Sequence, residues 1–337
     1  MGLYTELPGE FDTVDVIIAG GGTAGCIVAA RLADAGPNGV GSPAVDYPVL
    51  FLSHLLPGAK TALAYKSKES EGLADRKVAV RSGGVSGGGS AMNMMMYSRA
   101  QRSGFDSWQN TWLGRHGYDG HIHVSGRTYC ATRFQDDFIA AMNKVGHPEI
   151  RDLGSLDANN GVQRAMHYIS LTESVKIPHL NIFTKGFRAT STRISMWSSN
   201  HRSTQDTERS MKAKRMVIVS CGAFGAPSVL ERSGIGSPEI LRRAGVDRVV
   251  TNLPGVGYEY NAHDLIFCPY KSSLTPEETL DGIISGKLGP GQLIQSNGKI
   301  MGWTAQDVTC KLRPDDSEVV SLGPEFQEAW DKEFNTT

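Results

Sequence analysis

The clearest pattern of apolar and polar positions lies close to the N-terminus. Residues 16–19 form a short apolar run, Val-Ile-Ile-Ala, that ends at a glycine, and this length fits one buried strand. From residue 24 to residue 32 the apolar side chains recur at the spacing of a helix. The pattern therefore predicts a strand, a tight turn and a helix in direct succession.

A second unit of the same kind is predicted in the last third of the chain. The apolar, β-branched run within residues 215–220 precedes Gly222 and indicates another buried strand of the same sheet. A helix follows, which Pro227 can open at its first turn and Ser233 and Gly234 can close. Two such units favour a nucleotide-binding fold of the α/β class, with a parallel central sheet.

The remaining elements are expected from shorter patterns. An amphipathic helix is predicted over residues 134–145, with Phe134, Phe138, Ile139 and Met142 on one side. Further expectations are strands at 49–52 and 246–250, helices at 238–244 and around 276–284, a turn at 253–257, a solvated segment at 60–77 and an irregular polar segment at 172–210. Beyond Cys268 the chain becomes more polar, so a domain boundary is expected near residue 264.

The turn after the first strand carries a glycine pattern of the form G-x-G-x-x-G. Gly20 permits the turn, Gly22 lets the backbone approach a pyrophosphate, and Gly25 lets helix and strand pack closely. The pyrophosphate would lie at the helix N-terminus, where free N–H groups and the helix dipole favour an anion. The alternative is a purely structural glycine turn, because 39 glycines in one chain also produce such spacings by chance.

A second glycine-rich stretch lies further along the chain. Every residue from Ser82 to Ser90 except Val85 is glycine or serine, which is ordinarily typical of a flexible linker. Asn93 and three methionines follow at once, and a linker needs no such apolar, polarizable run. A backbone that lies against a flat ring needs glycine for close approach and methionine for soft contact. The alternative is a loop that leads into a methionine-rich core helix.

Composition narrows the classes of protein and partner. A length of 337 residues suits about two domains, and a net charge of -1 gives no electrostatic reason to expect a nucleic-acid or anionic-membrane partner. The odd number of five scattered cysteines indicates a reducing compartment with free thiols, and hence an intracellular protein.

Targeting segments and metal sites are not indicated either. Charges and glycines interrupt the apolar stretch at residues 14–32, so neither a signal peptide nor a membrane span is expected there. The last three residues are not a peroxisomal signal. His121 and His123 have no third ligand in view, and no metal site is assigned.

Together these motifs resemble the glucose-methanol-choline oxidoreductases, flavoproteins that oxidise alcohols, and among them the fungal alcohol (methanol) oxidases. Residues 20–25 match the turn that holds the FAD pyrophosphate in that family. Residues 87–93 are similar to its first signature, and residues 222–227 with 233–236 to its second, although Ala226 stands where Ser or Thr is usual. The resemblance runs from about residue 14 to about residue 326.

The resemblance implies a FAD-dependent oxidoreductase that acts on the CH–OH group of a small-molecule primary alcohol. In the family a hydride passes to the flavin, a histidine takes the hydroxyl proton, and oxygen accepts the electrons. The implied fold is a Rossmann-like FAD-binding domain over residues 1–264, followed over 265–337 by the start of an α+β substrate domain with an antiparallel sheet. The residues implied to hold FAD are Gly20, Gly22, Thr23, Ala24, Gly25, Ser90, Asn93, Met94, Met95 and Met96.

The sequence also departs from the family pattern. Ser53 replaces a glutamate that binds ribose, and Asn-Ala-His at residues 261–263 replaces Gln-Asp-His. Family members continue past Thr337 and carry a paired histidine there, and none of the nine histidines here lies in a matching motif. No catalytic residue is therefore assigned in this chain. The alternative is a truncated, non-catalytic remnant that keeps the flavin-binding scaffold, and the resemblance leaves a homo-oligomer open.

Overall fold

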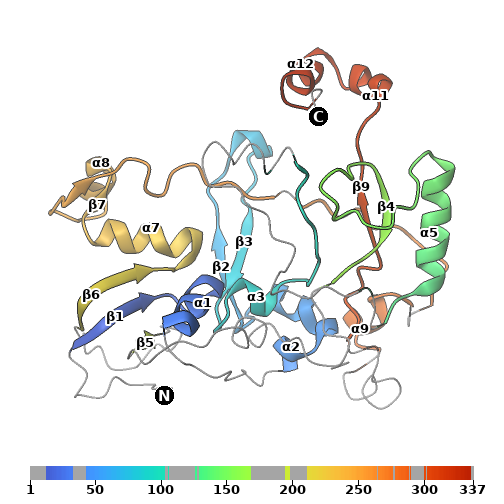
Figure 1. The fold of residues 1–337 in the computed structure, drawn as a ribbon. Helices are drawn as coiled ribbons and strands as arrows, with labels where there is room; N and C mark the ends of the chain where they lie inside the picture. The colour runs from blue at the N-terminus through green and yellow to red at the C-terminus, as the bar shows by residue number, and fades with distance from the viewer. Residues whose placement is uncertain are drawn as a thin grey trace. The chain divides into compact units, whose positions relative to one another are not determined.

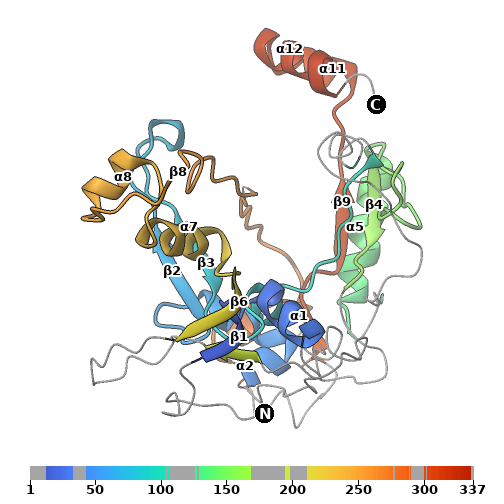
Figure 2. The same cartoon turned by 60° about the vertical axis from the view of Figure 1, so that its left-hand side comes forward.

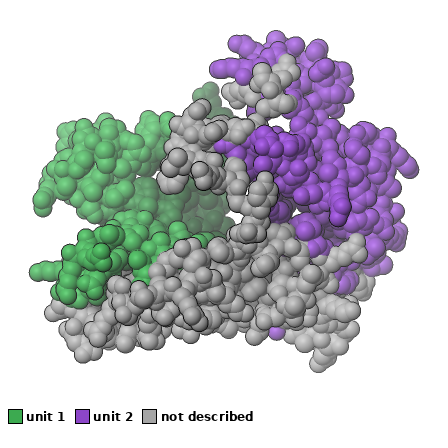
Figure 3. All heavy atoms as spheres, in the orientation of Figure 1, with its two compact units in different colours: residues 1–45, 50–93, 178–271 green, residues 46–49, 94–177, 272–337 purple. Residues whose placement is uncertain are grey.

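The computed structural model describes residues 13–32, 43–102, 105, 126, 129–167, 194–197, 211–263, 265–275, 278–287, 289, 300 and 302–334. The predictions for His121, His123 and most of residues 172–210 lie outside this set. The chain divides into two compact units, which Figure 3 colours separately. Unit 1 comprises residues 1–45, 50–93 and 178–271, and unit 2 comprises residues 46–49, 94–177 and 272–337. The division at residue 264 stays a prediction.

Unit 1 is built on a parallel sheet (Figure 1). Its strands, in order across the sheet, are β5 (Ile194–Trp197), β1 (Thr13–Ala19) and β6 (Lys212–Val219), and both pairings are parallel. Val14, Val16 and Ile18 of β1 are buried and alternate with less buried neighbours, which is the period of a strand. The predicted α/β class with a parallel sheet is confirmed. The strand β5 lies in a segment that was expected to be irregular, so that expectation is wrong for residues 194–197.

Two strands of this sheet lead through glycine into a helix. α1 (Thr23–Leu32) follows β1, and α7 (Gly222–Arg232) follows β6, so both predicted strand–glycine–helix units are confirmed. The position predicted for Pro227 is wrong, because this residue lies inside α7 and not in its first turn. Gly222 has a φ of +78°, which turns the chain sharply at the end of β6 and lets the helix begin at once.

Unit 1 also contains two smaller strand pairs. In the antiparallel pair, β2 (Ala62–Lys66) is joined to β3 (Ala79–Gly83) through the short 3₁₀ helix η2 (Glu71–Leu73). In the parallel pair, β7 (Ile235–Gly236) is joined to β8 (Thr251–Asn252) through α8 (Pro238–Arg243). The helix at 238–244 was predicted. The prediction of a strand at 246–250 is wrong, because the strand that pairs with β7 is β8, which begins at Thr251. The N–H of Val246 bonds back to the carbonyl of Leu241 and so belongs to the end of α8.

The strand predicted at residues 49–52 is also wrong. After α2 (Pro43–Asp46), these residues belong to a 3₁₀ helix, η1 (Pro48–Leu55), in which Val49, Phe51 and His54 are buried. A short apolar run fits a strand or a buried helical segment equally well, and only the packing decides between them. Ser53 therefore lies within η1 and not at the end of a strand.

Unit 2 contains an antiparallel pair with a helix packed against it (Figure 2). β4 (Gly161–Arg164) pairs with β9 (Val308–Lys311), and α5 (Thr132–Lys144) packs on both strands. The predicted helix at 134–145 is thus confirmed, with Ile139 buried in the core beside Gln135. The other helices described in this unit include α9 (Asp281–Ile284), α11 (Asp316–Ser321) and α12 (Pro324–Glu333). Among all the helices described, none has the length and apolar character needed to cross a bilayer.

Candidate nucleotide-binding site

The turn between β1 and α1 is closed by two glycines that tolerate no side chain. Gly20 has a φ of +104°, and a Cβ on it would collide with the carbonyl oxygen of Ser220. A Cβ on Gly25 would collide with the carbonyl oxygen of Gly20. The first and third glycines of the motif therefore allow the turn to lie against β6 and the helix to pack on the turn, which are the close approaches the pattern predicts.

The end of β6 fixes this turn from its other side. The N–H of Ser220 donates to the carbonyl of Ala19 at 2.7 Å, and its hydroxyl lies 3.0 Å from the carbonyl oxygens of both Ala19 and Gly20. These bonds join the carboxyl ends of two neighbouring parallel strands, the edge at which α/β folds bind ligands. Sequence reasoning did not single out Ser220. Its only signal is its position at the end of a strand, just before Gly222.

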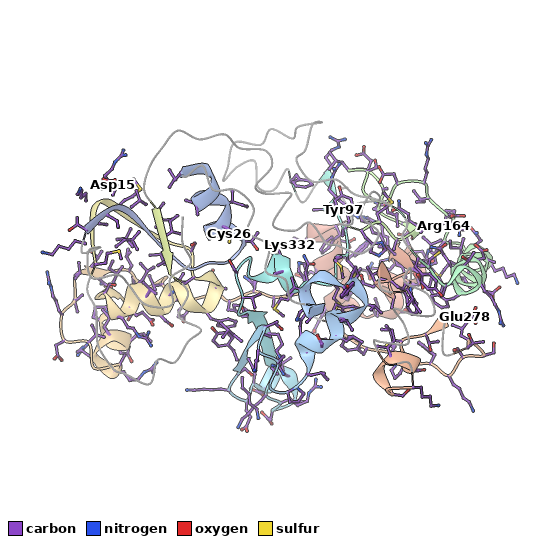
Figure 4. The ribbon with its side chains drawn as sticks, turned by 90° about the horizontal axis from the view of Figure 1, so that it is seen from below. Asp15, Cys26, Tyr97, Arg164, Glu278 and Lys332 are labelled. Atoms are coloured by element: carbon purple, nitrogen blue, oxygen red, sulfur yellow. The ribbon has the colours of Figure 1, made fainter. Side chains whose placement is uncertain are left out.

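The N-terminus of α1 is open beside Gly22. A Cβ on Gly22 would meet only the carbonyl oxygen of Ser220, at 4.0 Å. The first bond along the helix runs from the N–H of Cys26, labelled in Figure 4, to the carbonyl of Gly22 at 2.9 Å. No acceptor among the described residues bonds the N–H groups of Gly22, Thr23 or Ala24. These donors and the positive end of the helix dipole make an anion position.

The glycine–serine segment after β3 lies directly on this helix N-terminus. The N–H of Gly87 donates to the carbonyl of Gly21 at 2.9 Å. Gly88 has a φ of +56°, and a Cβ on it would lie 2.7 Å from the Cα of Gly22 and 3.2 Å from the backbone nitrogen of Thr23. The two glycine-rich segments are thus in contact within unit 1. A side chain at position 88 would fill the space in front of α1.

The Thr23 hydroxyl joins these segments, and the Ser90 hydroxyl supports the same carbonyl from within the glycine–serine segment. Thr23 Oγ1 donates to the carbonyl of Gly87 at 2.9 Å and accepts the N–H of Ser90 at 3.2 Å. Ser90 Oγ donates to the same carbonyl at 2.7 Å, next to the start of the short helix α3 (Gly89–Met92). Both hydroxyl protons are therefore used within the protein.

The asparagine and methionines expected beside a flat ring follow α3. Asn93 is exposed and ends a segment of unit 1, and Met94 begins a segment of unit 2. Met95 is buried with a φ of +58°, a left-handed backbone that is uncommon for methionine, whereas Met96 is 46% exposed. Residues 94–96 lie outside any helix, so they do not form the methionine-rich core helix of the alternative reading. Their contact with a flavin stays a prediction.

His167 lies beside this methionine segment in unit 2, where its backbone pairs with that of Met96. Its Nε2–H donates to the carbonyl of Gln306 at 3.0 Å and lies 2.9 Å from Thr304 Oγ1. Burial lowers the pKa of His167, and the bond to Gln306 opposes this shift. The neutral ring therefore donates a hydrogen bond that joins His167 to residues 304–306.

The other three histidines in the described part of the chain do not stand out as a general base, the group that would accept a proton from a substrate. His54 Nδ1 lies 2.7 Å from Thr61 Oγ1, and burial lowers its pKa. His147 Nδ1 lies 2.9 Å from Asn160 Oδ1, and His263 is exposed. None of the four histidines that the structure describes is therefore assigned a catalytic role. Within the residues that the structure describes, no group of three His, Cys, Asp or Glu side chains could hold a metal ion.

These features define a class of protein. A parallel sheet, a glycine turn between its first strand and helix, and an open helix N-terminus at the carboxyl edge are the parts of a dinucleotide-binding α/β fold. Of the ten residues predicted to hold a cofactor, the structure brings the five in the turn together with Ser90. Their role as cofactor ligands stays a prediction.

The family follows from comparison with known sequences. The sequence profile of the GMC oxidoreductase family matches residues 14–131 and 165–264, so the chain belongs to this family. The resemblance seen in the motifs is thereby confirmed. The matched ranges contain both glycine-rich segments and the β6–α7 unit.

Individual relatives agree with this assignment. The chain is 29% identical to the alcohol oxidase of Candida boidinii and 26% identical to that of Pichia angusta, in each case over 97% of this chain and 58% of the relative. The chain thus spans less than two thirds of the length of these relatives. A solved variant of the formate oxidase of Aspergillus oryzae, studied for FAD modification, is 17% identical with a TM-score of 0.67, over 96% of this chain and 65% of that one. At such low identity this match supports the fold alone.

Proposed function

We propose that unit 1 of this chain binds FAD and that the protein is a FAD-dependent oxidoreductase of the primary alcohol oxidase type. The observation that carries the proposal is the open N-terminus of α1, with Gly88 lying across it. The names of the two alcohol oxidases support the choice of a small-molecule alcohol as substrate and of oxygen as acceptor. Self-association of the chain stays a prediction.

The residues present fit a pyrophosphate group. The N–H groups of Gly22, Thr23 and Ala24 supply donors, and the helix dipole supplies a favourable potential for negative charge. A Cβ at position 88 would collide with the backbone of Gly22 and Thr23, so the native glycine lets the glycine–serine segment lie against the helix N-terminus.

The chemistry divides between the cofactor and the chain. FAD, when bound, would supply the acceptor for the hydride. Gly20 and Gly25 would hold the turn closed, the N–H groups of α1 would hold the pyrophosphate, and residues 93–96 would lie along the flavin. Oxidation of an alcohol also needs an acceptor for the hydroxyl proton.

A second candidate function is FAD binding without turnover. It is favoured by one observation, that among the described histidines His54, His147 and His167 each use one ring nitrogen in a hydrogen bond inside the protein. In that case the chain keeps the flavin-binding scaffold and does not oxidise alcohol.

One experiment separates these functions. The purified chain is incubated with FAD, freed of excess cofactor, and its visible spectrum is recorded before and after anaerobic addition of methanol or ethanol. A retained flavin band that bleaches supports the oxidase, and a retained band that does not bleach supports binding without turnover. A colourless protein contradicts both.

A further inference from the structure

The hydroxyl of Thr23 lies at the centre of the contact between the two glycine-rich segments. Oγ1 donates its proton to the carbonyl of Gly87 at 2.9 Å and accepts the N–H of Ser90 at 3.2 Å. A threonine hydroxyl has a single proton, so this proton is not available to a phosphate oxygen. The side chain of Thr23 therefore serves the glycine–serine segment, while its backbone N–H stays free for a ligand.

The carbonyl of Gly87 receives both hydroxyl protons. Ser90 Oγ donates to it at 2.7 Å, in addition to Thr23. The N–H of the same residue donates to the carbonyl of Gly21 at 2.9 Å. The peptide groups on both sides of Gly87 are thus fixed to the turn after β1 by bonds that involve only protein atoms.

The segment that these bonds fix would otherwise be highly flexible. Residues 82–90 are almost entirely glycine and serine, and glycine loses more backbone freedom on ordering than any other residue. Gly87 and Gly88 also adopt φ angles of +93° and +56°, which set the bend that brings position 88 over Gly22. If a ligand had to order this bend, its affinity would fall by the cost of that ordering.

We infer that the Thr23 hydroxyl is a latch on the Gly87 carbonyl, which Ser90 Oγ braces from within its own segment, and that this latch holds Gly88 against the N-terminus of α1 before any cofactor binds. The two side chains are positioning residues, and the phosphate contacts at this point are made by backbone N–H groups. The effect on cofactor affinity rests on the proposed FAD binding. The latch itself is a property of the chain without cofactor.

The test uses two substitutions at position 23. Thr23→Val keeps the shape and removes both hydrogen bonds, and Thr23→Ser keeps the hydroxyl. Hydrogen exchange of the cofactor-free protein is expected to speed up about tenfold at the amide of Gly87 in the valine variant and to stay near the native rate in the serine variant, because loss of the Thr23 bonds lets Gly87 leave the carbonyl of Gly21 and one hydrogen bond is worth a factor of this order. The amide of Ser90 also donates to the carbonyl of Gly87 at 3.2 Å, so its exchange is expected to change less. FAD affinity, measured by quenching of flavin fluorescence, is expected to fall about tenfold with valine and to be retained with serine.

The two readouts separate the possible failures. Weaker FAD binding by Thr23→Val with unchanged exchange at Gly87 would identify Thr23 as a direct ligand and overturn the latch. Faster exchange in a protein that binds no FAD would leave the latch standing and contradict the proposed function. Exchange in the middle of α1 reports whether the valine variant is folded. If it is not, Thr23→Ala removes the same two hydrogen bonds of the hydroxyl, and an unchanged exchange rate at Gly87 in that variant also overturns the latch.

Discussion

Gly88 is the residue at which the absence of a side chain matters most for the candidate site. Its backbone has a φ of +56°, and a Cβ would lie 2.7 Å from the Cα of Gly22 and 3.2 Å from the nitrogen of Thr23. The next residue, Gly89, is exposed and has no atom within 4 Å of a Cβ built on it. Two adjacent glycines thus have very different tolerance for substitution, which the sequence alone does not distinguish.

Gly88→Ala is expected to weaken FAD binding by at least tenfold, because the methyl group fills the space in front of α1. It is also expected to lower the free energy of unfolding by at least about 1–3 kcal/mol, because a φ of +56° with a ψ of −130° is a backbone conformation that L side chains rarely adopt and because the methyl group would collide with Gly22. Gly89→Ala is the matched control and is expected to change neither quantity appreciably. The measurements are flavin titration and urea denaturation, and equal loss of affinity in both variants would contradict the prediction.

His167 is the residue from which we expect a pH dependence of stability. Its pKa in the folded protein lies below the value of about 6.5 in an unfolded chain, because burial disfavours the imidazolium form. Between these two pKa values the unfolded chain binds more protons, so acidification favours unfolding. His54 is shifted in the same direction for the same reason.

The free energy of unfolding is accordingly expected to fall as the pH is lowered from 7.5 through 6.5 to 5.5. His167→Gln retains an amide donor for the carbonyl of Gln306 and removes the titrating ring, so its stability should depend less on pH. Urea denaturation of both proteins at the three pH values checks this. An identical slope against pH in the variant would show that His167 does not contribute.

At the scale of secondary-structure elements, α5 is joined to the two strands of unit 2 by polar contacts as well as by its apolar face. The side-chain Nε2 of the buried Gln135 donates to the backbone carbonyl of Asp307 at 2.7 Å, and its Oε1 accepts from Arg164 at 2.8 Å. Arg164, labelled in Figure 4, also pairs with Asp136 and Glu149. One glutamine therefore links α5 to β4 and to the chain that enters β9.

Gln135→Leu is expected to destabilise the protein by about 1–2 kcal/mol, because it removes two buried hydrogen bonds while keeping a similar volume. The Asp307 carbonyl retains a bond from the N–H of Ala165, which limits the loss. Asp137→Ala, on the exposed side of the same helix, is the control and should stay within about 0.5 kcal/mol of the native protein. Chemical denaturation measures both, and equal stability of the two variants would argue against the link.

For the whole molecule, the proposed site predicts stabilisation by a ligand that carries a pyrophosphate. Binding only to the folded chain adds about 2.7 kcal/mol when the free ligand is at 100 times its Kd, and the melting temperature rises accordingly. FAD is expected to raise the melting temperature, whereas riboflavin, which has the same ring system and no phosphate, is expected to have much less effect. Differential scanning fluorimetry with both compounds provides the measurement. An equal shift with both would show that the anion position at α1 is not used.

Much of unit 1 could be predicted because its signals are local. The strand, glycine turn and helix at residues 13–32 follow from a buried apolar run, three spaced glycines and a helical period, each of which is read within a few residues. The helix α5 was found for the same reason. The apolar run at 49–52 carries no such period, and a short run of this kind fits a strand or a helical segment equally well; in the structure it belongs to the 3₁₀ helix η1, with Val49 and Phe51 buried.

The sequence by itself determined the α/β class, the glycine turn after β1 and the family, since these depend on spacings within short stretches. The tertiary structure decided which distant residues meet. It placed Ser220 against Gly20 across 200 positions of chain, and Gly88 against Gly22. It also committed the hydroxyl of Thr23 to a carbonyl 64 residues away. The physical reason is that such contacts are set by how strands and turns pack in space, which no local pattern of residues records.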